Sequence, residues 1–309
     1  MALPRATRLQ RYLQASLFRY VRRSFAFWER RGIHLTLTHH GSPIPDTQAL
    51  SRDLFRKKTA LVGIEMRERE QLSLLETFRT SYRDEYERFP FAPEGLPRHA
   101  YYMRNIWFGA LDASVYWCMI RHVRPRRIVE VGAGMSTFLS AEAVRLNAQE
   151  GSSADLVAIE PFPRDELVEG FPGLTRLIAE PVQGVPLELF TDLAENDILF
   201  IDSSHVLRIG SDVQYEILEI LPRLRPGVFV HFHDILLPAE YHEEWILDNH
   251  TFWNEQYLLQ AFLTFNDSFE VVWASSYLHH RHGPALQEAF SNYQGPRGRP
   301  SSLWIRRTR

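Results

Sequence analysis

The chain has 309 residues, 45% of them hydrophobic and 24% charged, with a formal net charge of −3. A chain of this length can form one large α/β domain with an appendage, or two modest domains. The small net charge gives no overall reason to expect nucleic acid as a partner. The single cysteine, Cys118, excludes an intrachain disulfide framework and a multi-cysteine metal site, which suits a reducing cytoplasm.

The amino-terminal segment shows no secretory pattern, because arginines interrupt each of its apolar stretches. The most apolar segment, residues 106–123, carries Asp112 and Arg121 and is too polar to span a membrane. We therefore expect a cytoplasmic protein.

Residues 7–31 have the spacing of an amphipathic helix, with apolar residues on one side and arginines on the other. Such a helix fits two roles: it can lie on an anionic membrane, or pack on its own domain or a second subunit. We expect the packed arrangement, in a homo-oligomer. In the loop at 37–50, His39, His40 and Asp46 are either ligand-contacting groups or part of a plain connector.

The spacing of apolar residues predicts a charged helix over 65–89 and a long apolar helix over 101–123. Three prolines between 90 and 97 separate these two segments. We therefore predict an amino-terminal helical region at 1–98, with a covering or oligomerisation role, and a second domain at 99–309.

The second domain begins with a strand over 127–131, a turn with two glycines, and a helix over 135–147. A parallel α/β sheet builds nucleotide sites from this strand, turn and helix. Gly132 and Gly134 let the backbone approach a ligand closely because they carry no Cβ. Thr137 stands where a dinucleotide-binding fingerprint has its third glycine, which disfavours a pyrophosphate ligand and a nicotinamide-dependent oxidoreductase.

Seven segments have the length and composition of strands: 127–131, 156–159, 174–178, 197–202, 228–234, 269–274 and 303–306. The segment 197–202 is apolar throughout, as in a parallel strand covered on both faces. Helices are expected over 212–224 and from Trp253 onward. We predict a Rossmann-like, doubly wound, mostly parallel α/β sheet of seven strands that ends with antiparallel strands.

The stretch from Glu130 to Ser136, Glu-Val-Gly-Ala-Gly-Met-Ser, resembles motif I of class I S-adenosylmethionine-dependent methyltransferases. The resemblance implies the sheet order of that fold and S-adenosylmethionine as the cofactor. It also implies a set of cofactor-contacting residues: Glu130, Gly132, Ala133, Gly134 and Ser136.

Glu160 closes the second strand, whose end lies beside that of the first strand in such a sheet. A carboxylate there can accept hydrogen bonds from both ribose hydroxyls, although Glu160 could also be a neighbour of a helix N-cap. Tyr102 and Asn105, from the preceding helix, are candidates for contact with the methionine end of the cofactor.

Asp202 and Asp234 end the fourth and fifth strands, so both acids should converge beside the cofactor. Two carboxylates and the imidazole of His233 fit Mg²⁺ or Mn²⁺, with the histidine favouring the softer ion. His205 or His233 could take a proton from the substrate. The alternatives are that Asp202 only contacts the cofactor or caps a turn, and that His231 is an internal strand residue.

These residues form a D-x-x-H … H-D pattern that resembles a methyltransferase subgroup, which includes cephalosporin-hydroxylase-like proteins. More distantly, they resemble the acidic strand ends of catechol-type O-methyltransferases. The resemblance implies methyl transfer to a small molecule, with Asp202 and Asp234 positioning the acceptor directly or through a metal. The combination of a base and a metal site indicates a hydroxyl as the acceptor. A nitrogen or carbon acceptor, a hydroxylase-like use of redox-active iron and a non-catalytic binding protein remain alternatives. The mixed aromatic and polar segment after the fifth strand supplies substrate candidates: Tyr241, His242, Trp245, Trp253 and Gln256.

Overall fold

The computed structural model describes residues 8–295 and 298–309 and divides the chain into two compact units. The larger unit comprises Phe55–Tyr241 and Trp253–Arg309, and the smaller one comprises Met1–Leu54 and His242–Phe252. The compact units thus divide at 54/55, and the smaller unit includes a segment from late in the chain. A functional boundary at 98/99 stays a prediction.

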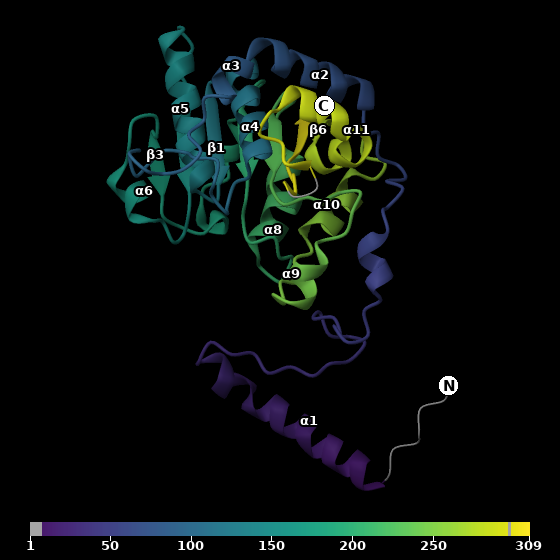
Figure 1. The fold of residues 1–309 in the computed structure, drawn as a ribbon. Coiled ribbons are helices and arrows are strands. Elements are labelled where there is room, and N and C mark those ends of the chain that lie inside the picture. Colours follow the sequence, from purple (N-terminus) through teal and green to yellow (C-terminus); the bar gives the residue numbers. More distant parts are fainter. Residues whose placement is uncertain (1–7, 296–297) are drawn as a thin grey trace. The chain divides into compact units, whose positions relative to one another are not determined.

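The larger unit is built on one seven-stranded sheet with the order β3-β2-β1-β4-β5-β7-β6. Figure 1 labels β3, β1 and β6 of this sheet. Its first five strands pair in parallel, whereas β7 is antiparallel to both β5 and β6. The strands are β1 Arg127–Val131, β2 Asp155–Ile159, β3 Arg176–Ile178, β4 Ile198–Ile201, β5 Phe229–Phe232, β6 Phe269–Ala274 and β7 Leu303–Arg307. The predicted doubly wound, seven-stranded fold is therefore confirmed.

Helices cover both faces of this sheet because alternate residues of each strand point to opposite faces. In β1, Ile128 belongs to one apolar cluster, and Val129 and Val131 belong to the other. The first cluster includes residues of α2 Glu68–Ser81, α3 Arg83–Tyr86, α4 Ala110–Val123, α5 Met135–Gln149 and α11 Ser275–Ala289. The second cluster includes residues of α7 Glu188–Thr191, α8 Asp212–Tyr215 and α10 Glu255–Leu263. The remaining short helices are α6 Asp165–Glu169, α9 Glu243–Leu247, and the 3₁₀ segments Arg52–Arg56 and Val182–Gly184.

Three predicted helices differ from the structure. The helix expected over 101–123 begins only at Ala110, because Asn105 folds the preceding segment into a loop. Its Oδ1 accepts hydrogen bonds from the backbone of Trp107 and Phe108, and its Nδ2 donates to the carbonyls of Tyr102 and Phe108. An asparagine that bonds to nearby backbone in this way offers an alternative to helix.

The helix expected over 65–89 is interrupted at Tyr82, between α2 and α3. The helix expected over 212–224 is continuous but changes its hydrogen bonding. It passes from α8 into a π-helical turn over Glu216–Ile220 and a 3₁₀ turn over Leu221–Arg223. The helix α11 was not predicted from the sequence; it contains Pro284 and has non-helical backbone angles at His282.

In the smaller unit, the predicted amphipathic helix is present as α1 Arg8–Glu29. Within this unit several of its apolar side chains remain exposed, including Leu17 at 57% and Phe27 at 48%. Among the described residues, no helix is both long and apolar enough to cross a membrane.

Candidate active site

The turn after β1 is packed directly against the end of β4. The backbone N–H of Asp202 donates to the carbonyl of Val131 at 2.8 Å. Gly132 has φ +82°, and a Cβ placed there would lie 1.9 Å from the carbonyl oxygen of Asp202. Only glycine fits such a left-handed position with backbone this close. The glycine turn therefore fixes the start of the 202–205 segment.

Thr137 closes this turn, which explains why a third glycine is not needed. Its Oγ1 accepts a hydrogen bond from the backbone N–H of Gly134 at 3.0 Å, where α5 begins. In a dinucleotide-binding turn the residue at this position is a glycine that allows close packing of helix on strand, so Thr137 departs from that fingerprint.

Glu130 lies beneath the turn and is fully buried. One of its oxygens accepts hydrogen bonds from the hydroxyls of Tyr116 and Ser140, both at 2.7 Å. Burial raises the pKa of Glu130 to about 7. The carboxyl therefore ties α4 and α5 to the strand, and its direct contact with a cofactor stays a prediction.

A pocket of about 130 Å³ opens over the turn. Its lining combines four of the predicted cofactor residues on the turn with Glu160 and Asp202; the complete set is Trp107, Phe108, Gly132, Ala133, Gly134, Met135, Ser136, Glu160, Arg164 and Asp202. Asn105 does not line it. A larger cavity, about 420 Å³, lies on the α4–α5 side and contains none of the predicted site residues.

Glu160 is held in this pocket by backbone hydrogen bonds. Its Oε2 accepts from the N–H of Ala133 at 3.2 Å, and its Oε1 accepts from the N–H of Phe162 at 2.9 Å. Opposite the carboxylate, Arg164 stacks on the ring of Trp107, with its guanidinium carbon 4.2 Å from the ring centre. Trp107 and Arg164 were missed in the sequence, because a loop gives no periodic signal.

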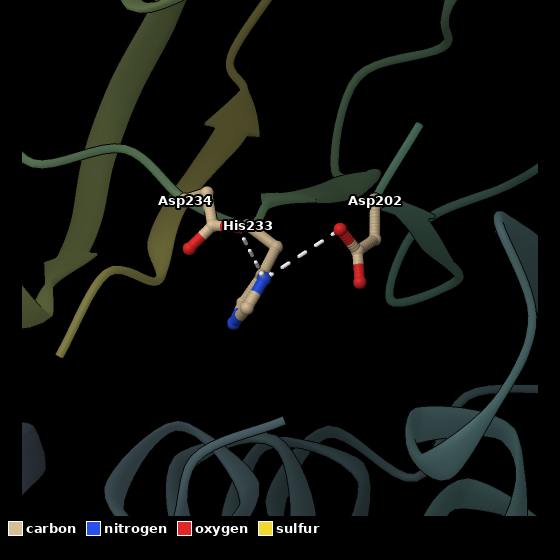
Figure 2. Close-up of side chains that lie close together, drawn as sticks. All are labelled: Asp202, His233 and Asp234. Atoms are coloured by element: carbon tan, nitrogen blue, oxygen red, sulfur yellow. Dashed lines mark ion pairs between the residues drawn. The ribbon is translucent and has the colours of Figure 1, made fainter. Parts of the chain in front are cut away.

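Asp202, His233 and Asp234 converge at the carboxyl ends of β4 and β5 (Figure 2). Each offers one ligand atom, and the three atoms lie within 4.8 Å of one another. Nδ1 of His233 lies 3.5 Å from Oδ1 of Asp202 and 3.6 Å from Oδ2 of Asp234. Both ring nitrogens of His233 are buried without a hydrogen-bond partner. A buried acceptor that faces two carboxylates in this way suits a cation ligand.

The charges of this cluster are strongly coupled. Burial lowers the pKa of His233, but the charges of Asp234 and Asp202 outweigh it and raise this pKa to about 9. Burial also opposes ionisation of Asp202, yet His233 and His205 hold its pKa far below the usual range. Without a cation, the histidine proton balances the two carboxylates.

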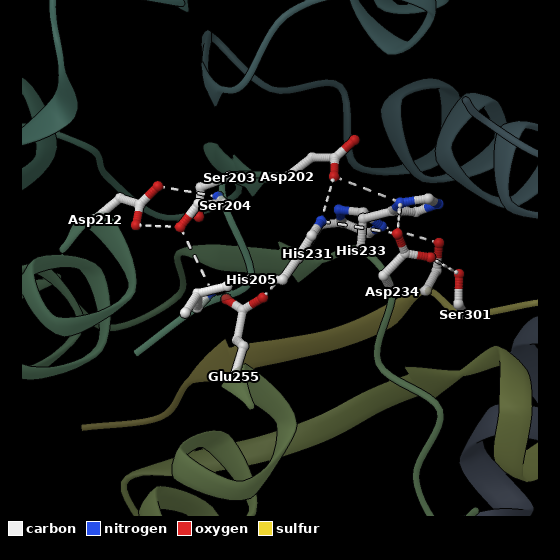
Figure 3. Close-up of polar contacts among 12 residues, drawn as sticks. Asp202, Ser203, Ser204, His205, Asp212, His231, His233, Asp234, Glu255 and Ser301 are labelled. Carbon is white, nitrogen blue, oxygen red and sulfur yellow. Dashed lines mark hydrogen bonds and ion pairs between the residues drawn. The ribbon is translucent and has the colours of Figure 1, made fainter. Parts of the chain in front are cut away.

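His205 faces the same cluster from the other side (Figure 3). Its Nε2 lies 3.2 Å from Oδ1 of Asp202, and its Nδ1 lies 2.8 Å from Oε2 of Glu255. Burial lowers the pKa of His205, but hydrogen bonds to Asp202 and Glu255 raise it well above the usual value. His205 and Asp234 both have positive φ, at 58° and 54°, which is uncommon for these residues and frequent in functional sites.

Two acids that the sequence did not single out support this arrangement. Asp112, in α4, accepts hydrogen bonds from the backbone of Ser301 and Ser302, and the Ser301 hydroxyl donates to Asp234 at 3.1 Å. Glu255, the first residue of α10, is fully buried beside His205. Neither shows a signal in the sequence, because each reaches the site from a distant element.

His231 is buried within β5, as expected for an internal strand residue. Its ring stacks on that of Phe200 with 4.0 Å between the ring centres, and its Nε2 lies 2.9 Å from the Ser302 hydroxyl. Burial lowers the pKa of His231, which keeps it neutral.

The five substrate candidates fall in different units; Gln256 is buried in the larger unit, where its backbone N–H donates to the Tyr241 hydroxyl at 3.1 Å. In the larger unit, the ring of Trp253 lies 4.5 Å from that of His205, and the buried Tyr241 lies 6.1 Å from Trp253. His242 and Trp245 belong to the smaller unit, with their rings 4.7 Å apart. Contact of any of these with a substrate stays a prediction.

A family model described as "Methyltransferase domain" matches residues 129–235, which include the glycine turn and the acid–histidine cluster. An uncharacterized protein from Archaeoglobus fulgidus is 36% identical over 167 residues, which cover 52% of this chain and 74% of that protein.

Solved structures with a similar arrangement are more distant. An O-methyltransferase from Bacillus cereus in complex with S-adenosylhomocysteine is 13% identical, with a TM-score of 0.37 over 76% of this chain and 91% of that one. A CmcI protein with magnesium and S-adenosylmethionine is 17% identical, with a TM-score of 0.36 over 73% and 84%. With TM-scores this low, these structures say nothing about the activity of this chain. The matched model and the sheet order together support one assignment: residues 129–235 form a methyltransferase domain, within a sheet that has the Rossmann-like methyltransferase fold.

Proposed function

We propose that this protein transfers the methyl group of S-adenosylmethionine to a hydroxyl of a small molecule, with a divalent cation at Asp202, His233 and Asp234. One observation carries the proposal: Asp202 both lines the pocket over the glycine turn and belongs to the cation-binding cluster. A cofactor over the turn and an acceptor at the cluster would therefore be neighbours.

The residues of the pocket fit the cofactor. A Cβ added to Gly134 would meet no atom within 4 Å, so the turn leaves open space at the pocket. Glu160 presents a carboxylate for the ribose hydroxyls, already oriented by its two backbone donors. When bound, S-adenosylmethionine supplies an activated methyl group on its sulfonium.

The cluster fits a hard or borderline cation such as Mg²⁺ or Mn²⁺, because two carboxylates and one unpartnered imidazole nitrogen face one another. A bound cation would supply a positive charge that lowers the pKa of an acceptor hydroxyl. Asp202 and Asp234 hold that acceptor in place. Holding the two reactants in the right geometry lowers the activation barrier of a displacement reaction.

His205 is the general base that this geometry favours. Its Nε2 faces the cluster beside Asp202, and Glu255 holds its Nδ1 on the opposite side. A positive charge between Asp202 and Asp234 would offset the negative charge that raises the pKa of His205. This pKa would then be lower, and Nε2 could be unprotonated and accept a proton from the substrate. His233, as a candidate ligand, is less available for that role.

Calorimetry with S-adenosylhomocysteine, with NAD⁺ and with Mn²⁺ tests the proposal. We expect binding of S-adenosylhomocysteine and Mn²⁺ but not NAD⁺, and loss of Mn²⁺ binding in Asp234→Asn. Glu142→Gln, an exposed carboxylate on α5, serves as the matched control.

Release of S-adenosylhomocysteine from a panel of small hydroxyl and amine acceptors, with and without chelator, then tests the acceptor class. Turnover of amines that survives chelation would contradict the hydroxyl and cation parts of the proposal. Failure to bind S-adenosylhomocysteine would contradict all of it.

A further inference from the structure

The helix α1 and the residues that follow it carry an unusual concentration of positive charge. Residues 15–35 contain Arg19, Arg22, Arg23, Arg30 and Arg31, and their one acid is Glu29. The carboxylate of Glu29 lies 3.3 Å from Nε2 of His34. Among the described residues, no ion pair neutralises Arg19, Arg22 or Arg23, so the charge of these three arginines of the helix is available to an outside partner.

These arginines lie on one side of the helix. With about 100° between successive residues, Arg19, Arg22 and Arg23 fall within roughly 100° of one another. Leu17, Val21, Phe25 and Trp28 lie on the opposite side, with Tyr20 and Phe27 at its edge. The helix is therefore amphipathic, with a positively charged side and an apolar side.

The apolar side is covered only in part within its unit: His34 stacks on the ring of Phe25, and the guanidinium of Arg31 lies over the ring of Phe27. The exposed fraction is 57% for Leu17, 55% for Tyr20, 36% for Phe25 and 48% for Phe27. Several large apolar side chains exposed together mark an interaction surface rather than ordinary scatter.

We propose that α1 lies in the plane of an anionic lipid surface, with its apolar side in the acyl region and its arginines among the phosphate headgroups. An arginine-rich polar side opposite an apolar side with Phe, Trp and Tyr is the composition of interfacial helices. Long arginine side chains reach from the helix edge to the headgroups while the helix itself sits lower. The helix does not span the bilayer, because its own arginines exclude that.

Charge complementarity favours lipid over a second copy of this chain. A second α1 packed on the same apolar side would leave the arginines of both helices on the outer sides of the pair, so that dimerisation would give these charges no acidic partner. An anionic surface instead attracts each arginine independently.

Vesicle flotation with the full-length protein tests the proposal. We expect binding to vesicles of phosphatidylcholine mixed with phosphatidylserine, and at least about tenfold weaker binding to phosphatidylcholine alone. Joint substitution of Arg19→Glu, Arg22→Glu and Arg23→Glu should weaken binding at least about tenfold. So should joint substitution of Leu17→Ser, Phe25→Ser and Phe27→Ser, because the apolar side supplies the insertion.

The matched control is the joint substitution of Arg145→Glu, Arg223→Glu and Arg225→Glu, which makes the same charge change on exposed arginines of the larger unit. It should leave vesicle binding within about twofold of the unchanged protein. Thermal unfolding of the larger unit should be the same in the unchanged protein and in both α1 variants, because α1 belongs to the smaller unit.

Three results would overturn the proposal: no preference for phosphatidylserine, equal loss of binding in the control, or unchanged binding in the apolar variant. Sedimentation identifies the competing occupant. A dimer that the apolar variant converts to monomer, without vesicle binding, would assign the surface to a second copy.

Discussion

Nδ1 of His205 lies 2.8 Å from Oε2 of Glu255, a carboxylate that the fold buries completely. His205 comes from the segment after β4, and Glu255 begins α10, fifty residues later. With Asp202 3.2 Å from its Nε2, the imidazole is held between two carboxylates from separate elements. A carboxylate at Nδ1 fixes the tautomer that leaves Nε2 able to accept a proton.

We expect Glu255→Gln to lower the rate of methyl transfer about 10- to 100-fold, because the amide can donate to Nδ1 and favour the wrong tautomer. The substitution also removes a buried charge that raises the pKa of the nearby Glu216. Thermal stability should therefore stay the same or increase. Steady-state kinetics and thermal unfolding of the same preparation measure both effects. A parallel loss of stability and rate would mean that Glu255 acts only through the fold.

We expect the apparent affinity for Mn²⁺ to rise with pH up to about 9, because a proton on His233 must leave when the cation binds. The pKa of His233 is raised, so the proton is held at neutral pH and lost above about 9. Affinity should rise about tenfold per pH unit below that point, if one proton is released. Calorimetry in buffers of different ionisation enthalpy counts the protons. An affinity independent of pH would rule out His233 as a ligand.

The two glycines of the turn should respond differently to alanine. In Gly132→Ala, the new Cβ would lie 1.9 Å from the backbone of Asp202 at φ +82°, so we expect loss of the folded state or severe destabilisation. In Gly134→Ala, no atom lies within 4 Å of the new Cβ, which instead enters the pocket. This variant should fold and bind S-adenosylhomocysteine more weakly. Circular dichroism and calorimetry separate the two effects; equal stability of both variants would contradict the described turn.

Glu130 predicts a specific pH dependence of stability. Burial raises its pKa from 4.5 to about 7, so the folded state holds the proton to higher pH than the unfolded chain does. Protonated Glu130 therefore makes its full contribution to the free energy of unfolding below pH 4.5. That free energy falls by on the order of 3 kcal/mol as the pH rises from 4.5 to about 7. Urea denaturation at several pH values should show this loss in the unchanged protein and not in Glu130→Gln. Parallel stability curves for the two proteins would contradict the assignment.

The strands were predictable because each is an apolar run of a length that only a doubly covered sheet can bury. The segments at 127–131 and 197–202 place their apolar residues on both faces, and the structure pairs them in parallel. Helix boundaries were less predictable. Residues 101–109 have helical apolar spacing, but the four hydrogen bonds of Asn105 to nearby backbone outweigh it.

The sequence by itself determined the strands, the glycine turn and the common edge at which Asp202 and Asp234 meet, because these follow from local patterns; the strand order followed from the resemblance to class I methyltransferases. Only the tertiary structure decided which groups surround them. Asp112, Glu255 and Ser301 reach the cluster from elements far apart in the chain, and Glu130 turns inward to hold the strand to its helices. Such contacts depend on how helices pack on the sheet, and a single sequence contains no local pattern for that.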